Sequence, residues 1–206
     1  MSSQSNMLGM GKILGARNNS LESAVFKQGK FPWLKKGDTW SVDSNMRDVF
    51  IMASGNQTYA ESKLEHNQWM SPDYGGSIGP EFGIANFGGS FKQDNVMLLK
   101  SCIGNRALGY DLLPPGSARK PYTDASGTKW TMGGYGDTCG KWLANETCAA
   151  TPPKFGAWYA GKQWDGDTGN AAYILNNLTK DKNSPFFPRL GGSATKYEVA
   201  GFFWWQ

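Results

Sequence analysis

Short apolar runs alternate with long polar, glycine-rich stretches along this chain. Residues 49–53 (VFIMA) and 96–99 (VMLL) are continuously apolar, which is typical of strands buried on both faces. Residues 197–206, rich in aromatic side chains, predict a last strand. A helix is predicted between the first two strands, and strand, helix, strand in this order indicates a parallel sheet with right-handed crossovers.

Three segments carry helix signals. Asn19 as N-cap with Glu22 three residues later fits a capping box, for a helix that stops at Gly29. Pro80 and Glu81 suit the first turn of a second helix, because proline fits its first position and a carboxylate the positive end of its dipole. Residues 163–180 have apolar side chains at roughly helical spacing and predict a third helix.

Two stretches are predicted to be irregular. Residues 56–76 are polar and turn-rich, and they contain His66, the only histidine, which we expect to be a surface or loop-packing residue. Residues 111–161 are punctuated by glycine and proline, and irregular stretches of this length are typical of a functional insertion or a lid. The tryptophans in this insertion would form either a sugar-stacking surface or a small separate core.

The composition indicates one globular domain spanning residues 1–206. Hydrophobic residues make up 39% and charged residues 18%, which is ordinary for a folded domain. The net charge of +4 comes from scattered lysines rather than a basic stripe, so no nucleic-acid partner is expected. No apolar run approaches the ~20 residues of a membrane span, so no membrane partner is expected either.

The three cysteines differ in their surroundings. Cys102 follows an apolar run and is predicted to be a buried thiol, since an odd count leaves at least one cysteine outside a disulfide. Cys139 and Cys148 share a polar, glycine-rich loop and can be bridged if the protein is secreted. The location is not determined by the sequence, and an extracellular or periplasmic one is favoured. No histidine or cysteine lies at zinc-ligand spacing, so no metal site is expected.

The stretch of greatest chemical interest is at the start, where Ser5 lies between two amides in residues 4–7 (QSNM). Small residues and glycines just after it suit a turn from a strand end into a helix. The Ser5 hydroxyl would then project from the carboxyl edge of a sheet, where helix N–H groups can stabilise an oxyanion. The alternative is that Ser5 merely caps a helix.

Two further motifs accompany the serine: residues 100–109 (KSCIGNRALG) and residues 199–206 (VAGFFWWQ). Together the three motifs resemble the sialate O-acetylesterase branch of the SGNH hydrolases, a group of carbohydrate esterases. The resemblance implies an α/β fold, a three-layer α/β/α sandwich with a parallel, flavodoxin-like sheet. It implies a serine esterase without a cofactor that removes O-acetyl groups from carbohydrate. Ser5 would be the nucleophile, and Gly104 and Gln206 would contribute to the oxyanion hole.

Two neighbours of Gly104 are weaker candidates. Asn105 would add a side-chain contact to the oxyanion hole. Arg106 would orient the substrate or pair with Asp111 and hold its own loop, and the structural role is the one we favour.

A general base is missing from this pattern. In the family the catalytic histidine and aspartate follow the last motif, and His66 is not at the family position. We therefore expect an N-terminal portion of an esterase, truncated at both ends. The alternative function is a non-catalytic carbohydrate-binding protein that keeps the esterase pocket. A nucleotide-binding function is disfavoured because no Gly-x-Gly-x-x-Gly or Walker motif follows a strand.

Overall fold

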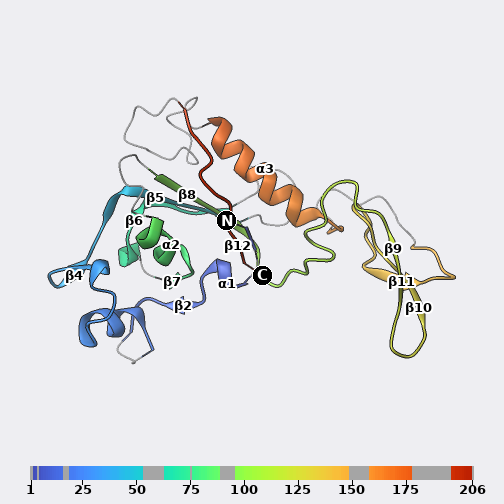
Figure 1. The fold of residues 1–206 in the computed structure, drawn as a ribbon, viewed down its shortest axis with the longest axis horizontal. Helices are drawn as coiled ribbons and strands as arrows, with labels where there is room; N and C mark the ends of the chain where they lie inside the picture. Colours follow the sequence, from blue (N-terminus) through green and yellow to red (C-terminus); the bar gives the residue numbers. More distant parts are fainter. Residues whose placement is uncertain are drawn as a thin grey trace. The chain divides into compact units, whose positions relative to one another are not determined.

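A five-stranded sheet forms the centre of the first of two compact units in the computed structural model of the chain (Figure 1). The structure describes residues 2–3, 5–15, 19–52, 63–74, 76–88, 96–148, 158–177 and 196–205. The first unit comprises residues 1–51, 64–104 and 174–206, and the second comprises residues 52–63 and 105–173.

The central sheet has the strand order β12-β1-β8-β5-β6. Its pairings of β1 with β12, β1 with β8 and β5 with β8 are parallel. The strands are β1 (Ser2–Ser3), β5 (Asp43–Met52), β6 (Lys63–Met70), β8 (Val96–Cys102) and β12 (Trp204–Trp205). The apolar runs predicted as strands are confirmed in β5 and β8, which are longer than the runs themselves.

The remaining sheets in the described residues are small and antiparallel. Two of them are two-stranded: β2 (Gly11–Lys12) with β7 (Ser77–Ile78), and β3 (Lys35–Lys36) with β4 (Thr39–Trp40). The third is three-stranded, with β10 (Lys129–Met132) between β9 (Lys120–Thr123) and β11 (Lys141–Leu143).

Helices are few in the described part of the chain. Its α-helices are α1 (Ser5–Leu8), α2 (Glu81–Gly88) and α3 (Lys162–Asn177), and only α3 is long. Shorter helical turns are η1 (Ser23–Lys27), η2 (Pro32–Leu34) and η4 (Pro72–Tyr74). The predicted helices at α2 and α3 are confirmed, and residues 178–180 of the predicted range 163–180 lie outside the described residues.

The predicted fold class, an α/β three-layer α/β/α sandwich of SGNH-hydrolase or flavodoxin type, is wrong. Three of the four sheets in the described residues are antiparallel, and the described helices are too few and too short to form two helical layers. The chain has a β-rich fold instead. The physical reason is the turn chemistry: glycine and proline interrupt the chain every few residues, which favours short antiparallel ribbons over helical crossovers.

Four local predictions also need correction. The predicted loop at 56–76 contains β6, which carries His66. The predicted irregular insertion at 111–161 contains the three-stranded sheet. Most of the strand predicted at 197–206 has no regular structure, since only β12 is extended there. The capping box is also absent: Glu22 accepts a hydrogen bond from the Gly15 N–H (2.9 Å), and the Ser20 hydroxyl accepts the Ser23 N–H (3.1 Å) instead.

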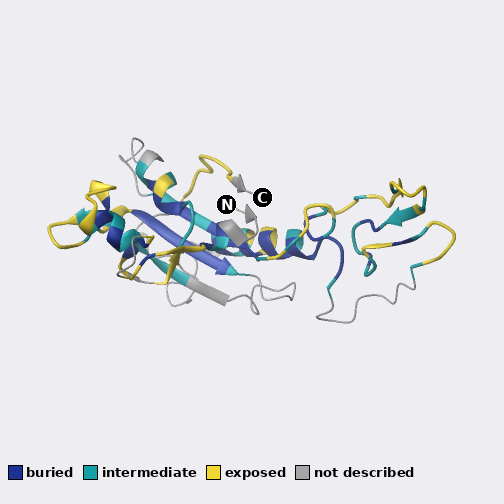
Figure 2. Ribbon diagram, turned by 90° about the horizontal axis from the view of Figure 1, so that it is seen from below, coloured by how far each residue is buried: buried dark blue, intermediate teal, exposed yellow. Residues whose placement is uncertain are grey.

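The core of the first unit lies between one face of the central sheet and the elements α2 and η1. Figure 2 shows the dark blue of buried residues along the strands of the central sheet. The buried apolar side chains that contact one another there are Val25, Leu34, Met46, Met70, Phe82, Ala85 and Leu98. Through these contacts α2 packs against β5 and β8.

The second unit is built on the three-stranded sheet and the first turns of α3. Cys139 and Cys148 form a disulfide there, nine residues apart in sequence. Gly161 has a φ of +93° and lies against the Leu113 carbonyl, so the chain enters α3 through a position that only glycine fits. In the first unit Cys102 is buried, as predicted, and is not part of the disulfide.

Candidate functional site

The ends of β1 and β8 meet at one edge of the central sheet. Ser3 pairs with Cys102 of β8 and with Trp205 of β12, and all three strands run in the same direction. Ser5 and Gly104 each follow these paired residues by two positions. Because the carboxyl ends of parallel strands open at the same edge, the serine motif and the glycine motif come together there.

Ser5 is the first residue of α1, so the predicted turn from strand to helix is present. The structure describes its backbone only. The helix contacts both β1 and β8, and Met7 is 1% exposed and anchors it. Gly9 then takes a φ of +94°, where an added Cβ would meet the Ile78 carbonyl carbon at 2.8 Å. The close approach to β7 therefore fixes how the chain leaves the serine turn.

Gly104 begins a bend directly after β8. Cys102 and Ile103 before it are buried, which holds the strand end in place. Asn105 after it is exposed and has a φ of +57°, a left-handed conformation that asparagine tolerates better than most residues. The predicted contact of Asn105 with an oxyanion stays a prediction, and Asn105 belongs to the second unit.

The third expected member of the oxyanion hole, Gln206, lies outside the described residues. Its neighbour Trp205 pairs with Ser3, so the described chain reaches the edge one residue before it.

Arg106 makes contacts within the second unit. Its guanidinium carbon lies 3.5 Å from the centre of the Trp158 ring, and a guanidinium nitrogen lies 4.0 Å from an Asp111 carboxylate oxygen. Asp111 also accepts the Ala107 N–H at 2.6 Å and the Trp158 indole N–H. These contacts fit the structural role, in which Arg106 holds its own loop. Its role in substrate binding stays a prediction.

A histidine–carboxylate pair that sequence reasoning missed lies within the central sheet. His66 Nε2 is 2.8 Å from the Asp48 carboxylate, which is completely buried. The prediction that His66 is a loop residue is wrong, because it lies on β6. The strand was not predicted because the residues around His66 are polar. The sequence indicates a buried carboxylate only through the position of Asp48, directly before an apolar run.

The register separates this pair from Ser5. Asp48 pairs with Leu98, and Leu98 precedes Cys102, the partner of Ser3, by four positions. At about 3.3 Å per residue these positions are ~13 Å apart along the sheet. A histidine side chain does not span that distance, so His66 is not within reach of the serine turn.

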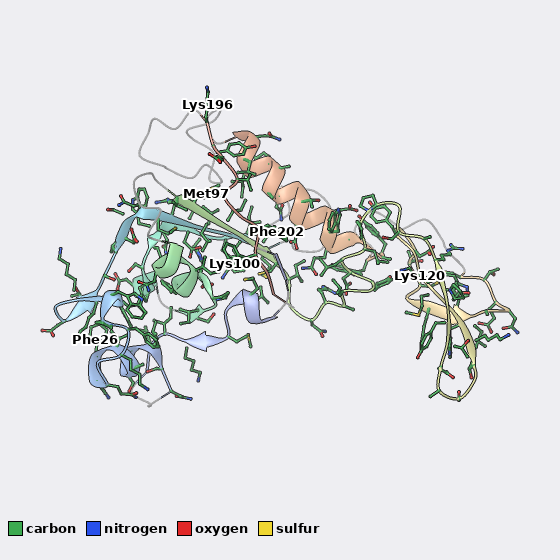
Figure 3. The ribbon with its side chains drawn as sticks, in the orientation of Figure 1. Phe26, Met97, Lys100, Lys120, Lys196 and Phe202 are labelled. Carbon is green, nitrogen blue, oxygen red and sulfur yellow. A yellow bond between two sulfur atoms is a disulfide. The ribbon has the colours of Figure 1, made fainter. Side chains whose placement is uncertain are left out.

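A second buried pair joins α2 to β8. Lys100 Nζ lies 3.3 Å from Glu81 Oε2, and both side chains are 1% exposed. Glu81 Oε1 accepts the Gly79 N–H (2.9 Å), and the Lys100 ammonium lies 4.3 Å from the centre of the Phe50 ring. Figure 3 labels Lys100 at the sheet. Glu81 thus serves its helix end, as expected, and also neutralises a buried lysine, which was missed.

Several side chains of the second unit have displaced pKa values, which often mark functional sites. Here each has a structural cause. Hydrogen bonds from Ser126 and Trp130 lower the pKa of Asp124 to about 2. The Arg119 guanidinium lowers the pKa of Asp137. Hydrogen bonding to Asp165 raises the pKa of Tyr135 to about 12, while burial and the same carboxylate raise that of Tyr159.

Other kinds of site find no support in the described part of the chain. It contains no group of three or more histidine, cysteine or acidic side chains that could hold a metal ion. None of its helices is long and apolar enough to cross a membrane.

Comparison with known proteins leaves the family open. No protein-family model, curated protein or solved structure matches the chain. The resemblance to the sialate O-acetylesterases therefore stays an interpretation of its three sequence motifs.

Proposed function

We propose that this chain carries the nucleophile of a serine esterase that removes O-acetyl groups from carbohydrate. One observation supports the proposal above all others: the parallel register of β1 and β8 brings the Ser5 motif and the Gly104 bend to one edge of the sheet. The proposal depends on this placement and on the three motifs. It does not depend on a sandwich fold.

In the proposed reaction the Ser5 hydroxyl attacks the carbonyl carbon of the acetyl ester. The sugar alcohol leaves with a proton, and water then releases acetate from the acyl-serine. The backbone N–H of Gly104 would donate to the oxyanion, with the Gln206 amide as a further donor. Asn105 and Arg106 belong to the second unit and are given no position in this scheme.

The base must come from a group other than His66. The sequence contains a single histidine, and it is held by Asp48 about 13 Å from the level of Ser3. The group that accepts the Ser5 proton therefore stays unassigned, and assays of a longer chain test whether further residues supply it. The alternative function is a carbohydrate-binding protein that uses the same edge without turnover.

Acetate release separates the two functions. The protein expressed from its complete reading frame and the chain of residues 1–206 are each assayed with p-nitrophenyl acetate and with an acetylated xylo-oligosaccharide. We expect turnover by the first protein and very slow hydrolysis by the second, because a positioned base is worth ~10²–10⁴-fold.

Three variants make this test specific. Ser5→Ala is expected to lower turnover by about 10³-fold or more, since the nucleophile acts as a unit with its base. Ser77→Ala, an exposed serine on β7, is the matched control and should leave the rate unchanged. Rapid turnover by residues 1–206 that is lost in His66→Ala would overturn our conclusion that His66 is not the base. No turnover with retained sugar binding would favour the alternative.

A further inference from the structure

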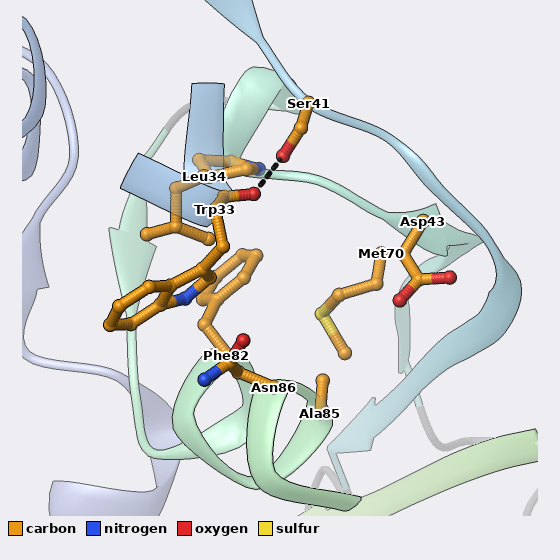
Figure 4. Close-up of a pocket in the computed structure, with 9 residues that line it drawn as sticks. Trp33, Leu34, Ser41, Asp43, Met70, Phe82, Ala85 and Asn86 are labelled. Carbon is orange, nitrogen blue, oxygen red and sulfur yellow. Dashed lines mark hydrogen bonds between the residues drawn. The ribbon is translucent and has the colours of Figure 1, made fainter. Parts of the chain in front are cut away.

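A small cavity lies at the amino end of β5, between η2, β6 and α2 (Figure 4). Its volume is about 80 Å³. In this measure one water needs roughly 10–15 Å³, so the cavity has room for several waters or for part of one sugar ring. Its walls combine aromatic, carboxylate and amide side chains from Trp33, Asp43, Phe82 and Asn86.

An exposed tryptophan, Trp33, forms part of the cavity wall. Trp33 is 45% exposed, and Phe31 beside it is 41% exposed. Their ring centres are 5.5 Å apart in an edge-to-face arrangement. Because Trp33 keeps almost half of its surface in solvent at the cavity wall, its indole ring can stack on a ligand.

The backbone at this pair is strained. Phe31 has a φ of +52°, a left-handed conformation that is a true outlier for a bulky side chain. The Leu34 N–H donates to the Phe31 carbonyl (3.0 Å), and the Ser41 hydroxyl donates to the Trp33 carbonyl (2.7 Å). Strain of this kind persists where surrounding contacts fix it, and it occurs most often at binding sites.

Two polar groups also line the cavity. Figure 4 shows the Asp43 carboxylate and the Asn86 amide around the same space as the Phe82 ring and Met70. The Asn45 N–H donates to Asp43 Oδ1 (3.0 Å), which orients the carboxylate. Phe82 and Met70 are buried and form a rigid floor.

From this arrangement we infer that the cavity is a binding subsite for one pyranose unit of a saccharide. The apolar face of a sugar ring stacks on an indole, while different hydroxyl groups of the ring bond to a carboxylate and an amide. A carboxylate acceptor and an amide, which both donates and accepts, can each bond to a hydroxyl group of a ring that lies in the cavity. A small organic cation would use the aromatic rings and Asp43 and would leave the amide donor of Asn86 unused.

This subsite is separate from the edge that carries Ser5 and Gly104. Asp43 begins β5, and Ile51, eight positions later, pairs with Ser101 near the opposite edge. The two places are ~26 Å apart along the sheet. Sugar binding here therefore does not depend on the proposed esterase activity, and it is measured in the Ser5→Ala variant.

The test follows the tryptophan indole N–H resonances by NMR as xylotriose, N-acetylglucosamine or tetramethylammonium chloride is added. We expect a saturable shift of the Trp33 resonance with a saccharide, with Kd near the millimolar range. Trp33→Ala and Asn86→Ala should each weaken binding about tenfold, as lost stacking or a lost hydrogen bond predicts. Tyr122→Ala, which removes an equally exposed ring in the second unit, is the control and should change nothing.

Three results would overturn the inference. One is a saturable response to tetramethylammonium and none to either saccharide. Another is the absence of saturable saccharide binding in the folded Ser5→Ala protein. The third is saccharide binding that Trp33→Ala and Asn86→Ala leave unchanged while both variants unfold at the temperature of the parent protein.

Discussion

Polar and charged side chains inside the first unit join elements that lie far apart in the sequence. Glu81 and Lys100 connect α2 to β8, and Asp48 and His66 connect β5 to β6. A buried ion pair is a weak source of net stability, because desolvation offsets most of the attraction. Removing one partner is costly, however, because the other charge then stays buried without compensation.

The pair Glu81–Lys100 gives a direct prediction. Glu81→Gln should lower the free energy of unfolding by about 3–5 kcal/mol, since it leaves the Lys100 ammonium uncompensated. Urea unfolding followed by tryptophan fluorescence measures this change. Glu146→Gln, at an exposed position of the second unit, is the matched control. A loss below about 1 kcal/mol would mean that Lys100 reaches solvent.

Asp124 gives a pH-dependent prediction. Its carboxylate accepts hydrogen bonds from Ser126, Thr128 and the Trp130 indole, which lower its pKa to about 2. A lowered folded-state pKa means that these bonds add stability above the unfolded value of 3.8, and that the contribution is lost as pH falls through about 2. The Trp130 indole resonance should therefore shift with a midpoint near pH 2. In Asp124→Asn the transition should disappear, and a midpoint near 4 in the parent would contradict the assigned contacts.

At the scale of elements, the sequence predicts the strands in which several consecutive apolar residues are buried, and the helix whose start carries a clear signal. The apolar runs at 49–53 and 96–99 predict β5 and β8, and Pro80 before Glu81 predicts the start of α2. By contrast, the sequence does not predict β6, because this strand carries Glu65, His66 and Asn67 in place of apolar residues. The sequence does not predict the pairing of β9, β10 and β11 either, because this pairing depends on contacts between strands rather than on the periodicity of a single strand.

The same limit applies to the candidate site. The motif at Ser5 predicts a turn from strand to helix, and the structure contains that turn. The cavity beside Trp33 was not predicted. It combines residues from four separated segments, and the positive φ of Phe31 leaves no trace in the residue type.

Gly161 provides a test at this scale. An alanine Cβ would meet the Leu113 carbonyl oxygen at 2.5 Å and the Tyr135 ring, at a φ of +93°. Gly161→Ala should therefore destabilise the second unit by more than about 2 kcal/mol, through both backbone strain and overlap. Gly127→Ala is the matched control, because φ is +83° there and nothing lies within 4 Å, so only about 1 kcal/mol of strain is expected. Equal losses in thermal unfolding would contradict the close approach.

At the scale of the whole molecule, the disulfide belongs to one unit only. Reduction of Cys139–Cys148 should lower the stability of the second unit by about 2–3 kcal/mol, because it opens a loop of nine residues. Hydrogen exchange of the Trp142 and Trp69 amides, one in each unit, measures the two effects separately. We expect faster exchange at Trp142 and no change at Trp69. Equal acceleration in both units would mean that they unfold as one.

The distribution of sulfur atoms has a practical consequence. Cys102 is buried in the first unit, whereas the other two cysteines are oxidised in the second. In the oxidised protein a thiol reagent such as Ellman's reagent can therefore react only at Cys102, and only after the first unit opens. The rate constant of this reaction, divided by that of a fully exposed thiol, gives the equilibrium constant for opening of the first unit in the absence of denaturant. Reductant sensitivity reports on the second unit in the same sample, so each unit can be followed by its own cysteine chemistry.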